Sequence, residues 1–153
     1  MVDDYEPFRK FVCSTLCRNA VFQIVGQGSD GPEAVHKAAE LQPDLIVLDI
    51  GLPTLSGLDA ARRIQEISPK SKILFLSQES SADVVQEALG VGALGYIVKQ
   101  EAGDELLAAL DAFLLGKEFV NRSLAGFGAT TARTCGGSES QSLQGTKSTI
   151  EVP

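Results

Sequence analysis

Residues 45–53, Leu-Ile-Val-Leu-Asp-Ile-Gly-Leu-Pro, decide the fold class of this chain. The unbroken apolar run followed by a Gly/Pro turn is typical of a strand that is buried on both faces of a parallel sheet. Asp49 ends the run and would lie at the carboxyl edge of the sheet, where open α/β folds bind their ligands. Because a lone carboxylate at the end of a core strand must be desolvated or paired, we take Asp49 as the candidate reactive group.

The remaining sequence alternates between strand-like apolar runs and segments with the apolar spacing of an amphipathic helix. This alternation predicts an α/β fold with a doubly wound, five-stranded parallel sheet and helices on both faces. The first strand of this sheet would be truncated, because only two residues precede an acidic pair. The predicted strands are residues 1–2, 21–25, 45–49, 73–77 and 95–99, and the predicted helices are residues 6–17, about 30–41, 58–67, about 81–90 and 104–115.

Composition narrows the class of protein. A chain of 153 residues suits one domain. Its formal charge of −7 and pI of about 4.7 argue against a nucleic-acid-binding surface, which needs a basic face. No apolar run is long enough to span a membrane and no signal peptide precedes the first strand, so we expect a cytoplasmic protein without a membrane partner. Cys13 and Cys17 are expected to be small buried apolar residues rather than metal ligands.

The character of the sequence changes after about Asn121, where Ser, Thr, Gly and Gln dominate and apolar periodicity is lost. Such a segment cannot bury enough apolar surface to offset its chain entropy. We therefore predict a folded domain over residues 1–118 and a disordered tail over residues 119–153. The tail shows no helix-turn-helix pattern, so we expect no output domain in this chain.

Polar side chains stand at the ends of the predicted strands: Asp3 and Asp4 after the first, Asp49 after the third, Ser77 after the fourth and Lys99 after the fifth. Parallel strands bring these ends to one edge of the sheet, so three carboxylates, a hydroxyl and an ammonium would converge there. Three acidic groups in contact repel one another unless a cation neutralises them. Oxygen ligands that leave room for water and phosphate suit Mg²⁺. The chemistry that fits this set is phosphoryl transfer to the Asp49 carboxylate.

Four motifs carry a family resemblance: Val2-Asp3-Asp4, Leu48-Asp49, Ser77 and Tyr96-Ile97-Val98-Lys99. In this order and spacing they resemble the receiver domain of two-component response regulators, over about residues 2–118. Gln100 in place of a Pro after Lys99, and Gly-Ala-Leu-Gly-Tyr at residues 92–96, are similar to receivers of the transcription-factor branch that carries a helix-turn-helix domain. The resemblance implies a flavodoxin-like fold of the receiver type.

The resemblance also implies a role for each matching residue of the acidic site. Asp49 would be the phosphoacceptor, and Lys99 would pair with the phosphoryl group. Asp4 and Asp49 would ligate Mg²⁺ together with the backbone carbonyl of Gly51. Asp3 would act on the ion mainly through water.

A conformational switch is implied in the same way. Ser77 would move toward the arriving phosphoryl group, and Tyr96 would turn inward to fill the vacated space. Such a coupled pair is a two-state element that phosphorylation biases. The fourth helix, the fifth strand and the fifth helix would report the change and would form the face of a homodimer.

We therefore expect a stand-alone response regulator that is phosphorylated on Asp49 by a sensor histidine kinase or a phosphotransfer protein. It would catalyse only its own phosphorylation and dephosphorylation, and it would bind no nucleic acid directly. Two other interpretations stay open: the truncated regulatory half of a DNA-binding regulator, and a phospho-independent binding module whose acidic site is silent. A small phosphatase would need a second Asp two residues after Asp49, where this chain has Gly51.

Two departures from the receiver pattern matter. Receivers have several apolar residues before the acidic pair, in a central strand, whereas this chain has only Met1 and Val2. Either the true start lies upstream of Met1 or the chain tolerates a shortened strand, and the sequence leaves both open. Gln78 follows Ser77 where receivers carry a small residue, and we expect its side chain to shade Asp49 and slow phosphate exchange.

Overall fold

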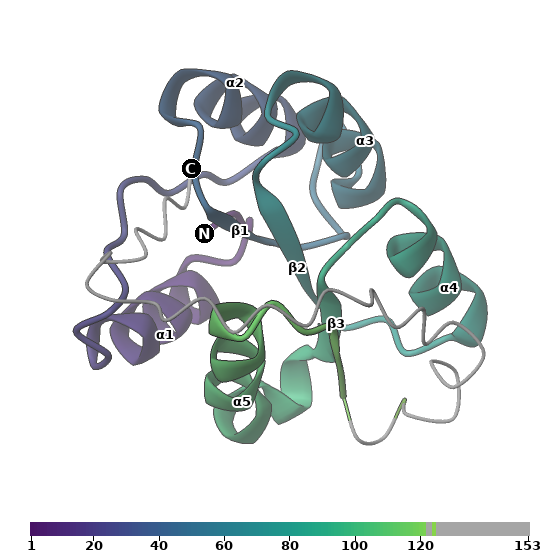
Figure 1. Cartoon of the computed structure of the whole chain (residues 1–153). Helices are drawn as coiled ribbons and strands as arrows, with labels where there is room; N and C mark the ends of the chain where they lie inside the picture. Colours follow the sequence, from purple (N-terminus) through teal and green to yellow (C-terminus); the bar gives the residue numbers. More distant parts are fainter. Residues whose placement is uncertain (122–123, 125–153) are drawn as a thin grey trace.

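The computed structural model describes residues 1–121 and 124 of the chain, and from α2 onward strands alternate with helices as predicted (Figure 1). The helices are α1 (Glu6–Cys17), α2 (Gly31–Leu41), α3 (Gly57–Ile67), α4 (Ala82–Gly90) and α5 (Ala102–Leu114), with a short 3-10 helix η1 (Lys99–Glu101) before α5. The strands are β1 (Leu45–Leu48), β2 (Lys72–Ser77), β3 (Gly95–Val98) and β4 (Phe119–Val120). None of the described helices combines the length and the apolar character that crossing a membrane requires.

The strands β1, β2, β3 and β4 lie side by side in that order, and every pair is parallel. On the other side of β1, Val2 pairs with Leu48 and also with Gly28. Across the sheet, the neighbouring segments are therefore Gly28, Val2, β1, β2 and β3. Numbered in chain order, this is the 2-1-3-4-5 strand order of a flavodoxin-like doubly wound sheet. The predicted fold class is confirmed, and β4 is an addition beyond β3.

Val2 alone occupies the first strand position, so the predicted truncation of this strand is confirmed. Its N–H donates to the Val47 carbonyl and its carbonyl accepts from the Asp49 N–H, both at 2.9 Å. On the opposite side, Gly28 donates to and accepts from the backbone that flanks Val2, at 3.0 and 3.1 Å. Four hydrogen bonds thus satisfy backbone groups that a missing central strand would leave bare.

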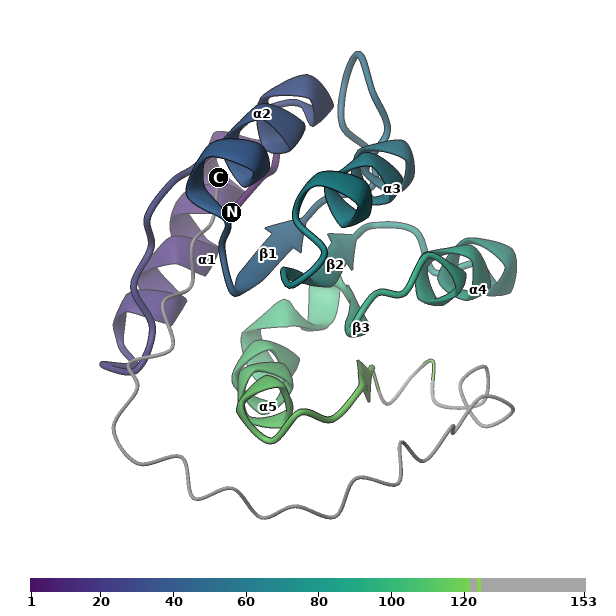
Figure 2. The same ribbon diagram turned by 45° about the horizontal axis from the view of Figure 1, so that its top comes forward.

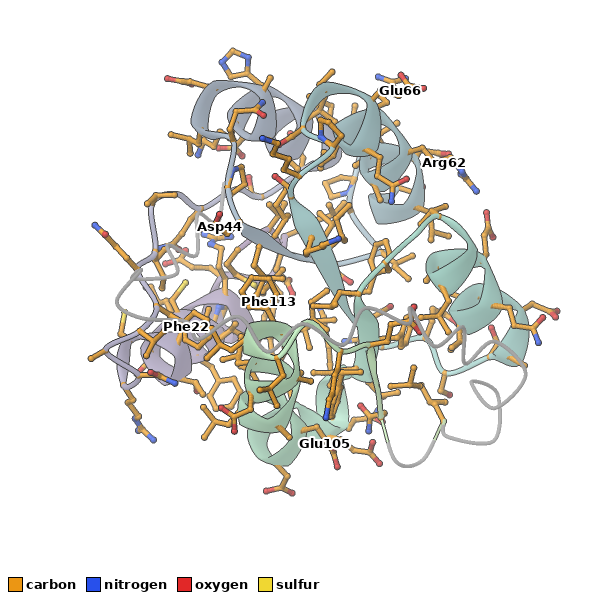
Figure 3. All side chains as sticks on the ribbon, in the orientation of Figure 1. Phe22, Asp44, Arg62, Glu66, Glu105 and Phe113 are labelled. Carbon is orange, nitrogen blue, oxygen red and sulfur yellow. The ribbon has the colours of Figure 1, made fainter. Side chains whose placement is uncertain are left out.

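The predicted strand at residues 21–25 is wrong, because these residues form no strand. Residues 21–25 would have to pair with the first strand to form a strand of the sheet. Only Val2 stands in that position, and it pairs with Gly28 instead. Phe22 serves the core instead. Its ring lies 6.5 Å from the ring of Phe113 in α5, and both side chains lie between α1 and α5 (Figure 3).

The folded unit extends past the predicted end at residue 118. Phe119 and Val120 form β4 and pair with β3, and Asn121 and Leu124 are buried. The prediction that the tail begins at residue 119 is therefore wrong for these positions, because the edge of β3 offers unpaired backbone groups to a following segment. The rest of the predicted disordered tail, residues 122–123 and 125–153, lies outside the described residues.

Helices cover both faces of the sheet, with α2, α3 and α4 on one face and α1 and α5 on the other (Figures 1 and 2). Each face has its own apolar cluster, and β1 contributes to both because strand side chains alternate: Ile46 joins the first cluster and Val47 the second. Cys13 is buried in the cluster beneath α1 and α5, as predicted. Cys17, the last residue of α1, is exposed, contrary to the prediction.

Gly57 lets the amino end of α3 approach the loop that follows β1. A Cβ added to Gly57 would lie 2.0 Å from the Asp49 carbonyl oxygen and 2.7 Å from the Cα of Ile50. The Gly57 N–H also donates to the Ile50 carbonyl at 2.8 Å. The packing of α3 therefore helps to fix the backbone on which Asp49 stands.

We expect Gly57→Ala to lower the free energy of unfolding by about 1–3 kcal/mol, the usual effect of overpacking a core. Gly90→Ala is the matched control, because Gly90 ends α4 and an added Cβ there meets nothing within 4 Å. The control should be neutral or stabilising by up to about 1 kcal/mol. Urea denaturation measures both variants, and equal stability of the two would contradict the close contact at Asp49.

Candidate functional site

The predicted site residues converge at the carboxyl edge of the sheet. Asp3 follows the Val2 bridge, Asp49 follows β1 and Lys99 follows β3. Asp3, Asp4 and Asp49 each offer one carboxylate oxygen, and these oxygens lie within 4.8 Å of one another. Asp3 and Asp49 are buried, whereas Asp4 is exposed. The parallel sheet therefore brings together the charged groups that the sequence placed at its strand ends.

Lys99 bridges the two buried carboxylates. Its Nζ lies 2.7 Å from Asp3 Oδ2 and 3.1 Å from Asp49 Oδ2. The ring of Phe8 in α1 also faces the ammonium, with 4.8 Å between Nζ and the ring centroid, which is a cation–π geometry. Burial by itself lowers the pKa of Lys99, but the interactions with Asp3 and Asp49 outweigh it, so this pKa is raised above its ordinary 10.5. Lys99 is therefore a fixed positive charge.

Asp49 is only 4% exposed. Its Oδ1 accepts a hydrogen bond from the Gly51 N–H at 3.2 Å, and its Oδ2 accepts from Lys99. Desolvation raises the pKa of Asp49 above its ordinary 3.8, and the nearby Asp3 carboxylate adds to the rise while Lys99 offsets only part of it. A shifted pKa that combines burial with specific charged neighbours is typical of reactive groups.

The turn after Val2 orients Asp3. The Asp3 Oδ1 accepts from the Tyr5 N–H at 2.9 Å, and Arg9 in α1 donates from Nη1 to the Asp3 carbonyl oxygen at 2.7 Å. Within the described residues Asp3 Oδ2 is buried and has no hydrogen bond of good geometry, although Lys99 Nζ lies 2.7 Å away as an ion-pair partner. Sequence reasoning missed Arg9, because it contacts a backbone carbonyl that no side-chain pattern reveals.

A pocket of about 330 Å³ opens beside the acidic cluster. This volume is at the low end of protein ligand pockets, about 300–1,000 Å³, so it suits a small group. Gly51 leaves its side of the pocket open, because an added Cβ there would meet only the Asp49 carboxylate, at 3.9 Å. Gln78 is exposed and lines the pocket. The lining residues are Asp4, Tyr5, Asp49, Gly51, Ser77, Gln78, Glu79 and Lys99.

The loop after β2 connects Ser77 with Tyr96. Ser77 is buried, and its Oγ accepts from the Glu79 N–H at 3.2 Å. Tyr96 is fully buried, so its ring already lies in the inward position that the sequence analysis expected it to reach on phosphorylation. Its hydroxyl donates to the Glu79 carbonyl at 2.7 Å. Burial raises the pKa of the Tyr96 hydroxyl, which keeps it a hydrogen-bond donor. Glu79 joins the two predicted switch residues through its backbone alone, so the identity of its side chain gave no signal in the sequence.

The donor set of the acidic cluster fits a hard divalent cation. Its members are carboxylates, and Mg²⁺ prefers oxygen ligands. Asp3 Oδ2 is a buried acceptor without a well-aligned donor among the described residues, and a cation close to the cluster would compensate the charge on such an atom. The pocket beside the cluster leaves room for water and for a further ligand. The residues present are therefore compatible with a magnesium site.

Comparison with known proteins identifies the family of this chain. The model of the response regulator receiver domain matches residues 1–111. The chain belongs to the response regulator receiver family. The chemotaxis protein CheY of Thermotoga maritima is 33% identical to this receiver over 111 residues, which cover 72% of the chain and 92% of CheY. The transcriptional regulatory protein DegU of Brevibacillus brevis is 31% identical over 121 residues, which cover 79% of the chain and 51% of DegU.

Solved structures agree with this assignment. The crystal structure of a LuxR-family two-component response regulator from Aurantimonas sp. SI85-9A1 matches the receiver with a TM-score of 0.79 and 28% identity, over 84% of this chain and 92% of that chain. This chain spans about half the length of DegU and of the response regulator VraR of Staphylococcus aureus. The receiver is thus similar to a relative of comparable length and to relatives about twice as long.

The raised pKa of Asp49 predicts that its ionised carboxylate destabilises the folded protein. An acid with a higher pKa in the folded state binds its proton more tightly there, so stability falls as the pH rises from 3.8 through the raised pKa. We expect Asp49→Asn to be more stable than the parent at neutral pH in EDTA. The difference should vanish at pH values below 3.8, because Asp49 is then protonated in both the folded and the unfolded parent.

Thermal unfolding of both proteins across this pH range measures the difference. Asp111→Asn, at an exposed position of α5, is the control and should follow the parent. A parent that is more stable than Asp49→Asn at neutral pH would show that the ion pair with Lys99 outweighs the desolvation of Asp49.

Proposed function

We propose that this receiver is a stand-alone, cytoplasmic response regulator that accepts a phosphoryl group on Asp49 from a sensor histidine kinase or a phosphotransfer protein. The strongest support is the contact between Lys99 Nζ and Asp49 Oδ2, 3.1 Å, at the pocket. This contact places the Asp49 carboxylate, the nucleophile, beside the Lys99 ammonium, which can bind the negatively charged phosphoryl group. The similarity to CheY over 92% of that protein's length supports the stand-alone form.

The proposed reaction is phosphoryl transfer to a carboxylate. An oxygen of Asp49 attacks the phosphorus and forms an O–P bond, while the bond from phosphorus to the donor breaks and its electron pair leaves on the histidine nitrogen of the partner, or on acetate when acetyl phosphate is the donor. Lys99 balances the added negative charge. Attack of water on the phosphorus later returns the Asp49 carboxylate and inorganic phosphate. The protein would catalyse only these two reactions on itself.

Asp4 and Asp49 would hold Mg²⁺ together with the backbone carbonyl of Gly51, and Asp3 would contribute mainly through water. When bound, the ion would neutralise the acidic cluster and the phosphoryl oxygens. The burial pattern supports this division of roles. Asp4 is exposed and lines the pocket, whereas Asp3 is fully buried and paired with Lys99.

Ser77 and Tyr96 would form the switch. Both bind the backbone of Glu79, so a Ser77 hydroxyl that turns toward a phosphoryl group gives up its bond to the Glu79 N–H and changes the loop that holds Tyr96. The change would reach the face formed by α4, β3 and α5, where we place the homodimer contact. We propose that the receiver itself binds no nucleic acid, in keeping with the net charge of −7 of the chain.

A second function also has an observation in its favour. The chain spans 51% of DegU and 52% of VraR, so the receiver also fits the regulatory part of a longer transcriptional regulator. The mass of the protein in its own cells, detected with an antibody against the receiver, distinguishes the two. A species near 16.2 kDa supports the stand-alone regulator, and a species of about twice that mass supports the longer one.

The purified chain should gain the mass of one phosphoryl group when it is incubated with acetyl phosphate and Mg²⁺. EDTA should prevent the gain, and Asp49→Asn should show none. Lys99→Met should slow the reaction by about 10²–10³-fold, the usual effect of removing one charge-stabilising group. Intact-mass spectrometry over time measures all four. A gain that persists in Asp49→Asn would contradict the assignment of the phosphoacceptor, and a folded parent that gains nothing would favour the phospho-independent binding module.

Mg²⁺ at about one hundred times its Kd should stabilise the parent by about 2.7 kcal/mol, because it binds only the folded site. Asp4→Asn should lose most of this stabilisation. Asp83→Asn, an exposed acid in the first turn of α4, should keep it. Thermal unfolding in a Mg²⁺ titration measures the effect. Equal responses of Asp4→Asn and Asp83→Asn would contradict the proposed ligand.

A further inference from the structure

The last part of the described chain covers the free edge of β3. We define the edge segment as Phe119–Asn121 together with Leu124. The Phe119 N–H donates to the Leu94 carbonyl at 3.0 Å, and the Asn121 N–H donates to the Tyr96 carbonyl at 3.1 Å. The edge segment therefore continues the parallel ladder along the strand that carries Tyr96.

Asn121 ties the edge segment to β3 through its side chain as well. Its Oδ1 accepts from the Val98 N–H at 3.0 Å, so backbone groups on either side of Ile97 bind the same residue. Asn121 is completely buried, and its Nδ2 has no hydrogen-bond partner among the described residues. Burial of an amide nitrogen without a hydrogen-bond partner costs free energy. The hydrogen bond from the Val98 N–H to Asn121 Oδ1 offsets this cost and keeps the side chain buried.

Gly95 makes the close approach of the edge segment possible. A Cβ added to Gly95 would lie 2.1 Å from the Phe119 carbonyl oxygen. Any larger residue at this position would push the segment away from β3. A single methyl group can therefore displace the edge segment without any change in the segment itself.

Tyr96 stands between the edge segment and the loop after β2. Its ring centroid lies 6.4 Å from that of Phe75 on the β2 side, and its hydroxyl donates to the Glu79 carbonyl. On the edge side, Val120 pairs with Tyr96 in the ladder. Val120 and Leu124 belong to the same apolar cluster as the Tyr96 ring. The edge segment thus covers the side of β3 that faces away from β2.

We propose that the edge segment is a positioning element that holds Tyr96 in its buried position beneath the loop after β2. Because β2 and Phe75 occupy one side of Tyr96, movement of the ring toward solvent requires space at the sheet edge, and the edge segment fills that space. The coupling is reciprocal. Release of the segment frees the phenol from Glu79, and a Tyr96 that has left the loop weakens the docking of the segment. This inference goes beyond the proposed phosphoryl transfer and does not depend on it.

The full chain contains two tyrosines and no tryptophan. In a Tyr5→Phe protein, Tyr96 is therefore the only tyrosine, and tyrosine fluorescence comes from Tyr96 alone. In this background, acrylamide quenching of tyrosine fluorescence measures the exposure of the Tyr96 ring. Amide hydrogen exchange of Phe119 and Asn121, followed by NMR, measures the docking of the edge segment. Neither measurement uses phosphate or Mg²⁺, so a failure here is separate from a failure of the phosphorylation tests.

Asn121→Ala removes the acceptor of the Val98 N–H, and Gly95→Ala displaces the segment from the β3 side. Both should speed exchange of the Phe119 and Asn121 amides by at least about fivefold, the effect of losing roughly one buried hydrogen bond. Both should also raise the quenching constant of Tyr96 severalfold. Leu115→Ala, at a position that is 68% exposed after α5, is the control and should change neither quantity.

Faster exchange in either variant without a rise in Tyr96 quenching would overturn the proposal, and so would unchanged exchange in both. The Tyr5→Phe protein gives the same test without a further substitution if the variants do not fold, as judged by circular dichroism. In urea below the unfolding transition, Tyr96 quenching should rise at the same concentrations as exchange at Asn121. Quenching that rises only with global unfolding would overturn the proposal.

Discussion

Lys99 lies between two carboxylates, Asp3 and Asp49, that are taken out of water at the ends of neighbouring strand positions. A buried carboxylate without a partner would take up a proton rather than keep its charge. The ammonium reaches both groups, and its own burial is compensated by two anions. Removal of Lys99 would leave both buried carboxylates without their cation, and breaking a buried ion pair in this way typically destabilises a protein by about 3–5 kcal/mol. The ammonium therefore lets two carboxylates stay buried together, and one of them, the nucleophile Asp49, lines a small pocket.

This arrangement requires the backbone at each strand end to stay in place, and the chain achieves it with few residues. Before Asp3, the first strand position is held by the two hydrogen bonds of Val2 to the β1 side and by the bonds of its neighbours Met1 and Asp3 to Gly28. At the end of β1, the close packing of Gly57 fixes the loop after Asp49. At the far edge, the edge segment pairs with β3 next to Tyr96. The site is thus assembled from local backbone contacts that a single residue can disturb.

Sequence reasoning succeeded where side-chain type and strand topology decide the outcome. Asp49 and Lys99 could be placed together because parallel strands share one edge, whatever their exact lengths. It failed where pairing depends on what the neighbouring segment offers. Residues 21–25 have the composition of a strand but no partner, whereas Phe119 and Val120 lie in a polar region and pair because β3 has a free edge. Glu79 was missed for a related reason, since its contacts to Ser77 and Tyr96 use backbone atoms and any residue provides those.

The most direct test of the central claim identifies the atom that accepts the phosphoryl group. An acyl phosphate on an aspartate is reduced by borohydride to homoserine, so treatment after incubation with acetyl phosphate and Mg²⁺ marks the modified position permanently. Peptide mapping by mass spectrometry then locates the mark. The account predicts homoserine at position 49, dependent on Mg²⁺ and on the phosphodonor. Homoserine at Asp3 or Asp4 instead, or a folded and Mg²⁺-loaded protein without homoserine at any position, would contradict it.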